Sequence, residues 1–281
     1  MKHTVATLAQ MKERGEKISQ VTCYDYTTAR LVDASGIDMI LVGDSLGMTM
    51  QGYKDTLPVT LDEMIIYGRS VERACERTFV VIDMPFMSYQ ISPAQALENA
   101  GKIMKETGAS AIKLEGGVDV APQIAAITAA GIPVVAHIGM TPQSVNMFGG
   151  FKVQGKGEAN ARRVLEDALA VQKAGAFAVT LECVPRKLAA LITKKLDIIT
   201  IGIGAGSDCD AQVLVYQDML GMTCGTVPKF VKKFAEIGEQ MKEAFSEYDK
   251  QVKDSSFPNE DYAYTKCDCS DEYLNILDQE Y

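Results

Sequence analysis

The feature that most constrains the fold of this chain is a unit that recurs along it. In each copy an amphipathic stretch ends in a glycine, and a short apolar run follows within two or three residues. Glycine adopts the left-handed conformation that ends a helix at little energetic cost, so each unit predicts a helix followed by a strand. The glycines that end these stretches are Gly36, Gly108, Gly131 and Gly175.

The apolar runs are continuous and rich in Val, Ile and Leu, which is typical of parallel strands buried on both faces. Candidate strands lie within residues 19–25, 39–45, 78–86, 110–117, 133–139, 176–183, 197–206 and, less clearly, 212–220. Strands and helices that alternate in this number predict a closed (β/α)₈ barrel, the TIM barrel fold. An open doubly wound sheet is the alternative, but the sequence lacks the glycine fingerprint expected after its first strand.

Two helix starts carry side-chain signals. Thr60 with Glu63, and Ser92 with Gln95, have the spacing of a capping box, and Pro93 suits the first position of a helix.

We expect one catalytic barrel over residues 1–255, with an N-terminal helix at its start and a closing helix within 227–245. Residues 256–281 are polar and acidic without helical periodicity, and we interpret them as a C-terminal extension that docks on a neighbouring subunit. Cys267 and Cys269 make up only half of a zinc-binding pattern.

Composition excludes several classes of function. The formal net charge is −9, from 37 acidic and 28 basic residues, and dense clusters of Lys and Arg are missing from the sequence, so nucleic-acid binding is not expected. Runs of about 18 apolar residues are also missing, so no membrane span is expected. The seven cysteines are mostly scattered and odd in number, which favours a reduced, cytoplasmic protein.

Polar residues stand repeatedly where the predicted strands end. In a parallel barrel, catalytic groups come from the C-terminal ends of strands. A charge that ends an apolar run is expensive to desolvate unless something binds it, so the repetition predicts a site. The residues are Tyr24, Asp25, Asp44, Ser45, Asp83, Lys113, Glu115, His137 and Glu182.

Three of these residues suit a metal. Asp44, Asp83 and Glu115 offer hard oxygen ligands from adjacent strands, the chemistry preferred by Mg²⁺. The chain has two histidines, His3 and His137, so a zinc site built on imidazoles is not expected. Alternatively, the acids only accept hydrogen bonds from loop amides or pair with a lysine.

The other residues suit proton transfer and substrate binding. Glu182 is a candidate proton acceptor, or else a structural partner of a basic residue. His137 either orients a substrate oxygen or is a packing residue. Lys113 could form a Schiff base if its pKa were lowered, but neighbouring carboxylates favour the charged ammonium, so an anchor for a substrate anion is expected.

Several segments together resemble a known family. They are LVGDSLGMTMQGYKDTLPVT, DMPFMSY, IKLEGG, HIGMTPQSVNMFGGFKVQGKG, LECVP and IGIGAGSDCDAQVLV, in this order. From about residue 3 to about residue 255 the chain is similar to the 3-methyl-2-oxobutanoate (ketopantoate) hydroxymethyltransferases. The resemblance implies a (β/α)₈ barrel of the phosphoenolpyruvate/pyruvate superfamily and a homo-oligomer, typically a decamer.

The resemblance also assigns roles to the strand-end residues. It implies metal binding by Asp44, Asp83 and Glu115, substrate binding by Asp44, Ser45, Asp83, Lys113 and His137, and proton abstraction by Glu182. The implied reaction transfers a hydroxymethyl group from 5,10-methylenetetrahydrofolate to 3-methyl-2-oxobutanoate. It forms 2-dehydropantoate for pantothenate and coenzyme A biosynthesis, through an enolate stabilised by one Mg²⁺ per subunit.

A glycine-rich basic stretch, residues 148–158, suggests a loop that closes over the folate. Lys152 and Lys156 could meet the glutamate tail of the folate, or the loop is solvated and has no role.

Two other functions stay open. A folate-independent 2-oxo acid lyase or aldolase of the same superfamily is one, although the KKCGH-like signature of those relatives is missing from the sequence. The other is a barrel that binds a metabolite without catalysis.

Overall fold

The computed structural model describes residues 2–225 and 227–281 and divides into two compact units. The first unit comprises Met1–Met219 and Thr223–Lys233, and the second Leu220–Met222 and Phe234–Tyr281. Each unit is described here by itself.

The first unit is a closed barrel of eight parallel strands that pair in chain order, β1 to β8, with β8 returning to β1. This confirms the predicted (β/α)₈ barrel. The strands are β1 (Ile18–Thr22), β2 (Met39–Val42), β3 (Phe79–Asp83), β4 (Ala111–Glu115), β5 (Val134–Gly139), β6 (Ala178–Glu182), β7 (Ile199–Ile203) and β8 (Ala211–Leu214).

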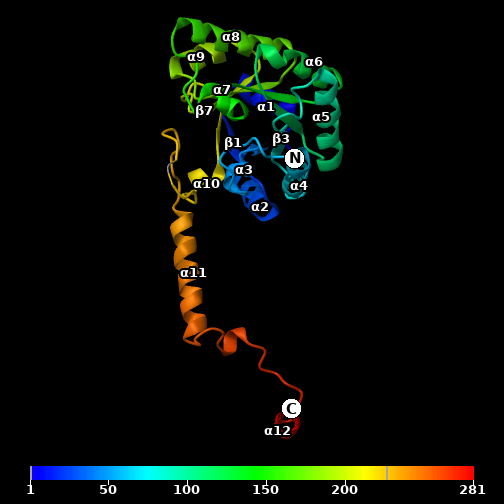
Figure 1. Ribbon diagram of the computed structural model, residues 1–281, viewed down its shortest axis with the longest axis vertical. Coiled ribbons are helices and arrows are strands. Elements are labelled where there is room, and N and C mark those ends of the chain that lie inside the picture. The colour runs from blue at the N-terminus through cyan, green and yellow to red at the C-terminus, as the bar shows by residue number, and fades with distance from the viewer. Residues whose placement is uncertain (1, 226) are drawn as a thin grey trace. The chain divides into compact units, whose positions relative to one another are not determined.

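Helices connect the strands on the outside of the barrel, as α5, α6 and α8 show in Figure 1. The longer ones are α1 (Val5–Glu13), α2 (Tyr26–Ser35), α4 (Leu61–Glu72), α5 (Pro93–Thr107), α6 (Ala121–Ala129), α8 (Glu158–Lys173) and α9 (Arg186–Lys195). Short segments follow some strands: α3 (Leu46–Thr49), η1 (Val118–Val120), η2 (Pro142–Ser144), α7 (Val145–Phe148) and α10 (Tyr216–Met219).

The predicted helix-ending glycines all have positive φ, which confirms their role. The φ values are 88° at Gly36, 79° at Gly108, 83° at Gly131 and 97° at Gly175. An L side chain rarely adopts such values, so glycine at these positions lets the chain turn from each helix into the next strand.

The two predicted capping boxes turn out differently. Thr60 and Glu63 form a complete box at the start of α4. At α5 the hydroxyl of Ser92 accepts from the backbone N–H of Gln95, but the side chain of Gln95 accepts from Ile91, one residue before the cap. Only half of the second box is therefore present.

The eighth strand is shorter than predicted. β8 ends at Leu214, and the residues from Tyr216 form α10 instead of continuing the strand to residue 220. The N–H of Tyr216 donates to the side-chain hydroxyl of Thr22 at 3.1 Å. It therefore makes no backbone hydrogen bond to the neighbouring strand, and the helix starts at this residue.

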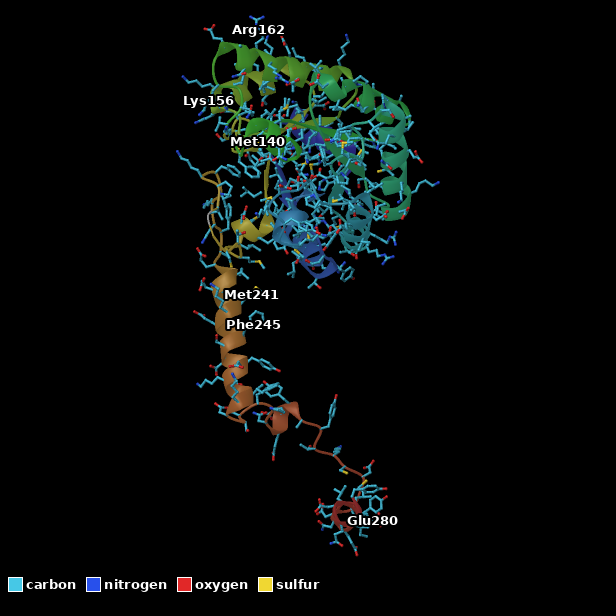
Figure 2. The ribbon with its side chains drawn as sticks, in the orientation of Figure 1. Met140, Lys156, Arg162, Met241, Phe245 and Glu280 are labelled. Carbon is cyan, nitrogen blue, oxygen red and sulfur yellow. The ribbon has the colours of Figure 1, made fainter. Side chains whose placement is uncertain are left out.

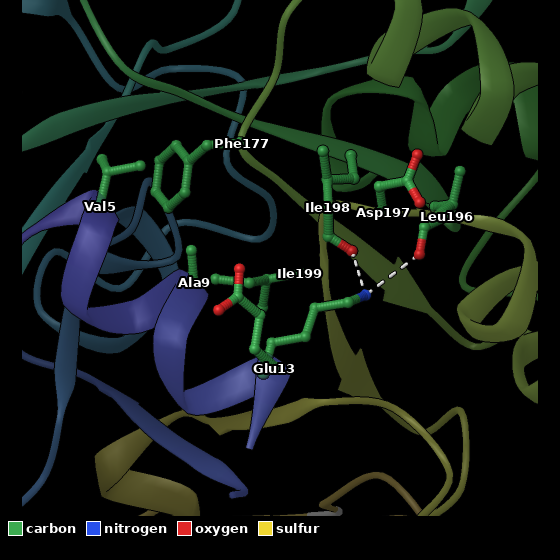
Figure 3. A pocket seen from close by; sticks show the side chains of 9 residues that line it. Val5, Ala9, Glu13, Phe177, Leu196, Asp197, Ile198 and Ile199 are labelled. Atoms are coloured by element: carbon green, nitrogen blue, oxygen red, sulfur yellow. Dashed lines mark hydrogen bonds between the residues drawn. The ribbon is translucent and has the colours of Figure 1, made fainter. Parts of the chain in front are cut away.

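Helix α1 packs at the N-terminal ends of the strands. Leu8 is fully buried in one cluster with residues of the barrel interior, including Ile18 and Phe79. A cavity of about 490 Å³ lies beside α1, and Figure 3 shows hydrogen bonds across it to the backbone oxygens of Leu196 and Ile198. The donor is Lys12, which also contacts Asp210 at 2.9 Å. These contacts of α1 lie at the N-terminal ends of the strands. The predicted site residues stand at the opposite, C-terminal ends.

The second unit contains α11 (Ile237–Lys253), η3 (Glu260–Tyr262) and α12 (Asp271–Glu280). This division differs from the boundary predicted at residue 255. The predicted closing helix begins at Ile237 and belongs to the second unit, since none of its residues is buried and its apolar side chains, such as Phe245 (64% exposed; Figure 2), do not enter a core. The C-terminal extension also holds a helix, α12, capped by Ser270.

Among the described residues, no helix has both the length and the apolar character needed to cross a bilayer.

Candidate active site

Most of the predicted polar residues meet at the C-terminal ends of neighbouring strands. Asp25 instead caps α2, where its Oδ1 accepts from the N–H of Thr28 at 2.8 Å. Strand register places Asp83 beside Lys113, Glu115 beside His137, and Gly139 beside Glu182. Because each pair sits on adjacent strands of one closed barrel, the register alone brings these side chains to the same mouth.

Lys113 and Asp83 form a buried ion pair. The ammonium of Lys113 donates to Asp83 Oδ1 at 2.5 Å, and both side chains are at most 6% exposed. Burial lowers the pKa of Lys113, but the nearby charges of Asp83, Glu115 and Asp44 outweigh it and raise the pKa above its usual value. Lys113 is therefore a fixed cation, which disfavours a Schiff base.

Asp44 lies beside this pair. Its backbone N–H donates to Asp83 Oδ2 at 3.1 Å. Burial, followed by the charges of Asp83 and Glu115, raises the pKa of Asp44 well above its ordinary value, although Lys113 and a hydrogen bond from Gln143 oppose the shift. Burial likewise raises the pKa of Asp83. The mouth therefore holds several buried acidic groups around the single ammonium of Lys113.

His137 lies between two glutamates. Its Nδ1 is 3.3 Å from Glu115 Oε1, and its Nε2 is 3.2 Å from Glu182 Oε2. Burial and Lys113 lower the pKa of His137, but contacts with Glu115 and Glu182 raise it to about 9. The ring is therefore an imidazolium at neutral pH, paired on both sides. This geometry favours an electrostatic role over the packing alternative.

Ser45 and Tyr24 complete this part of the mouth. Their hydroxyls lie 2.8 Å apart, and Ser45 is half-buried where α3 begins. Gly43 makes the arrangement possible, because a Cβ there would lie 2.8 Å from the hydroxyl oxygen of Ser45.

The predicted metal ligands are close, but they do not form a three-ligand set. Across residues 2–225 and 227–281, no three His, Cys, Asp or Glu side chains are arranged to hold an ion together. Glu115 Oε2 accepts from the backbone N–H of Gln143 at 2.9 Å, and its Oε1 faces His137. Both oxygens of Asp83 are contacted as well, by the Lys113 ammonium and by the backbone N–H of Asp44.

Two carboxylates still fit a magnesium ion. Mg²⁺ usually keeps several waters and binds through one or two carboxylates plus substrate oxygens, so Asp44 and Asp83 suffice as protein ligands. Burial is the main cause of the raised pKa values of both groups, and a cation bound here would favour their ionised forms. The donor chemistry therefore fits the cation that the sequence predicted.

Two buried residues of the site have no role in the sequence-based prediction. Gln143, in η2, donates from Nε2 to Asp44 Oδ2 at 2.8 Å. Its Oε1 accepts from the hydroxyl of Tyr89 at 2.7 Å. Both residues fall within segments that carry the family resemblance. The sequence pattern, however, does not indicate that an uncharged polar residue in a loop is buried.

The basic loop 148–158 is anchored near Glu182. The N–H of Gln154 donates to the backbone oxygen of Cys183, the residue after Glu182, at 2.9 Å. Lys152 and Lys156 are exposed, and Figure 2 labels Lys156. The loop thus joins the mouth through its backbone and leaves its cationic side chains accessible.

Two comparisons with known sequences identify the same family. A model of the ketopantoate hydroxymethyltransferase family matches residues 2–260. The 3-methyl-2-oxobutanoate hydroxymethyltransferase of Clostridium novyi is 58% identical over 264 residues, which cover 94% of this chain and 96% of that protein. The protein of the same name from Enterococcus faecalis is 55% identical over 277 residues, which cover 99% of this chain and 100% of that protein.

Solved structures are similar in fold. A 2,3-dimethylmalate lyase of the PEP mutase/isocitrate lyase superfamily gives a TM-score of 0.61 at 16% identity, covering 99% of both chains. A phosphonopyruvate hydrolase in complex with oxalate and Mg²⁺ gives a TM-score of 0.59 at 12% identity, covering 99% of this chain and 96% of that one. At these identities the likeness concerns the barrel and not the reaction.

Proposed function

The chain belongs to the ketopantoate hydroxymethyltransferase family, and we propose that its barrel mouth performs the family's reaction with Glu182 as proton acceptor and Mg²⁺ held by Asp44 and Asp83. The acceptor substrate is 3-methyl-2-oxobutanoate, and 5,10-methylenetetrahydrofolate is the proposed one-carbon donor. The cluster of buried carboxylates around Lys113 is the observation that carries this proposal.

The metal supplies Lewis-acid stabilisation of the negative charge that develops on the keto oxygen when the C3–H bond breaks. Asp44 and Asp83 are the proposed ligands. The proposed role of Glu115 is to contact the cation through a water and to pair with His137, whose Nδ1 lies 3.3 Å from its Oε1.

Lys113 and Ser45 bind the substrate in this scheme. Lys113 is a buried cation held by Asp83, so it can pair with the carboxylate or the keto oxygen of a 2-oxo acid. Ser45 is half-buried and can donate a hydrogen bond to the same substrate. Together they orient the 2-oxo acid so that its C3–H bond faces the base.

Glu182 removes the proton at C3. Its side chain is 14% exposed, against 3% for Glu115, so it is the more accessible of the two glutamates that flank His137. His137 Nε2 lies 3.2 Å from Glu182 Oε2 and holds the carboxylate in place beside the substrate site. His137 thereby orients the base and is also near enough to its proton to assist transfer.

The folate donor is expected to enter beside the loop 148–158. The loop's backbone is tied to Cys183, and its exposed Lys152 and Lys156 can pair with the anionic glutamate tail of the folate. We further propose a cytoplasmic homo-oligomer, a decamer by family resemblance.

A product assay tests the proposed function. With 3-methyl-2-oxobutanoate and 5,10-methylenetetrahydrofolate, the protein should form 2-dehydropantoate only when Mg²⁺ is present. Omission of the folate is the control, and cleavage of a larger 2-oxo acid without folate would instead support the lyase alternative. The family match and the identities above favour the transferase.

A further inference from the structure

Gln143 contacts two of the three predicted metal carboxylates. Its side-chain Nε2 donates to Asp44 Oδ2 at 2.8 Å, and its backbone N–H donates to Glu115 Oε2 at 2.9 Å. Only 6% of the residue is exposed, so water does not compete freely for these bonds. One residue therefore sets the positions of carboxylates from two different strand ends.

The orientation of the Gln143 amide is fixed by its other partners. Nε2 also donates to the backbone oxygen of Met84 at 3.0 Å, and a carbonyl oxygen can only accept, so the nitrogen must point this way. Oε1 accepts from the Tyr89 hydroxyl at 2.7 Å and from Gln90 Nε2 at 3.1 Å. All four hydrogen-bonding positions of the amide are filled, which leaves a flipped orientation without matching partners.

Tyr89 extends the same network to the backbone of β4. Its hydroxyl accepts from the N–H of Glu115 at 3.1 Å, and Tyr89 is 1% exposed. Gln143 and Tyr89 thus hold Glu115 from its side chain and from its backbone. The Gln143 amide holds Asp44 through its Oδ2.

We propose that Gln143 is a positioning residue that holds Asp44 and Glu115 in the arrangement required to bind the divalent cation. This inference rests on the proposed function. Partners of this kind orient metal ligands, and their loss typically weakens metal affinity roughly 10–100-fold. Gln143 does not touch the reacting atoms in this scheme and acts through Asp44.

The test measures metal affinity directly and does not depend on turnover. The full chain is stripped of metal and titrated with Mn²⁺, and free Mn²⁺ is followed by electron paramagnetic resonance. Gln143→Met keeps the length and bulk of the side chain but removes its donors, while the backbone bond to Glu115 survives. We expect the Kd for Mn²⁺ to rise by about 10–100-fold in this variant.

Gln123→Met is the matched control. Gln123 is 7% exposed in α6, and its Oε1 lacks a hydrogen-bond partner within the described chain. Its substitution also removes a buried amide, so it reports any general loss of folding, and its Kd should equal that of the wild type. Saturating Mn²⁺ should restore substrate C3 exchange in Gln143→Met, which a purely structural defect would not allow.

The outcomes separate the two proposals. A wild-type protein that does not bind Mn²⁺ overturns the proposed function and this inference with it. A wild type that binds, together with a Kd rise of less than about fivefold in Gln143→Met, overturns the inference alone. If Gln143→Met does not fold, the Kd for Mn²⁺ is measured in Tyr89→Phe instead. This substitution removes the hydroxyl that donates to Gln143 Oε1 and accepts from the N–H of Glu115. A Kd within about twofold of wild type in that variant would then overturn the inference.

Discussion

Glu182 differs from its neighbours at the barrel mouth in accessibility. Its side chain keeps 14% exposure, while Glu115 and Asp83 keep 3%. A carboxylate that accepts a proton from a bound substrate needs such an open side, whereas one that only balances charge can be enclosed. His137 lies between the two glutamates and contacts both of them.

Glu182→Gln should keep substrate binding and lose proton abstraction. The amide has nearly the same shape but cannot accept the C3 proton, so exchange of that proton for deuterium should fall by roughly 10²–10⁴-fold. Proton NMR of 3-methyl-2-oxobutanoate in deuterium oxide measures the exchange. Glu166→Gln, an exposed position in α8, is the control and should exchange at the wild-type rate. Unchanged exchange in Glu182→Gln would remove this residue from the role.

At this scale the sequence predicted the charged residues but not their partners. Asp83, Glu115 and Glu182 were recognisable because an acid that ends an apolar run must be bound by something. Gln143 and Tyr89 were not, because neutral polar side chains in loops show no comparable conflict with their surroundings. Their importance depends on contacts across the mouth that only the folded chain defines.

One buried carboxylate, that of Asp33 in α2, binds the residues that lead into β3. Asp33 Oδ1 accepts from the N–H of Arg77 at 2.9 Å and from the N–H and hydroxyl of Thr78 at 2.8 Å, and Oδ2 accepts from Glu76 at 3.2 Å. Burial opposes ionisation, but these bonds outweigh it and lower the pKa of Asp33. The carboxylate thereby holds residues 76–78 in place just before β3, the strand that ends at Asp83.

Asp33→Asn should destabilise the barrel and make its stability less dependent on acid pH. Loss of these charge-assisted bonds should reduce the free energy of unfolding by about 1–3 kcal/mol at neutral pH. Because the folded pKa is lowered, the wild-type advantage is present above the unfolded pKa of about 4 and disappears as the pH falls through the folded value. Urea unfolding at several pH values measures the difference, with exposed Asp119→Asn as the control. A difference that stays constant down to low pH would contradict this role of Asp33.

The loop 148–158 is the element that we propose contacts the folate. Replacing both Lys152 and Lys156 with Ala should raise the KM for a polyglutamylated 5,10-methylenetetrahydrofolate several-fold, because two exposed cations each contribute roughly 0.2–1 kcal/mol to pairing with the tail. The KM for 3-methyl-2-oxobutanoate should not change. Lys194→Ala with Lys195→Ala in α9 is the matched control. Equal folate KM values in the two double variants would leave the loop without this role.

The elements themselves were predictable where the sequence pattern was strong. Continuous apolar runs gave the first seven strands, and the glycines gave the helix ends. The last strand was not delimited, because Val213 and Leu214 run into Tyr216 without a glycine or proline to mark the change. Local apolar character alone could not show that the chain turns into α10 there.

For the whole molecule, the assignment of α11 was the least predictable feature. Its apolar residues recur at helical spacing, and such a face can cover a barrel or serve elsewhere equally well. The structure shows Met241 and Phe245 exposed on this helix and assigns it to the second unit (Figure 2). A sequence pattern defines which face is apolar but not what that face will contact.

The distribution of charge is also a property of the whole molecule. The chain carries a net charge of −9, yet the proposed chemistry depends on the few carboxylates buried around Lys113. A hard cation at Asp44 and Asp83 would balance them and make the C3 proton of a 2-oxo acid removable. Exchange of that proton requires the base, the substrate contacts and the cation, but not the folate.

The most direct measurement is therefore deuterium exchange at C3 of 3-methyl-2-oxobutanoate, followed by NMR on protein treated with EDTA and then resupplied with metal. The exchange should vanish with EDTA and return with Mg²⁺ or Co²⁺, and Asp44→Asn should not recover. Exchange that persists in EDTA, together with borohydride trapping of the substrate on Lys113, would contradict the metal-stabilised enolate and support a Schiff base.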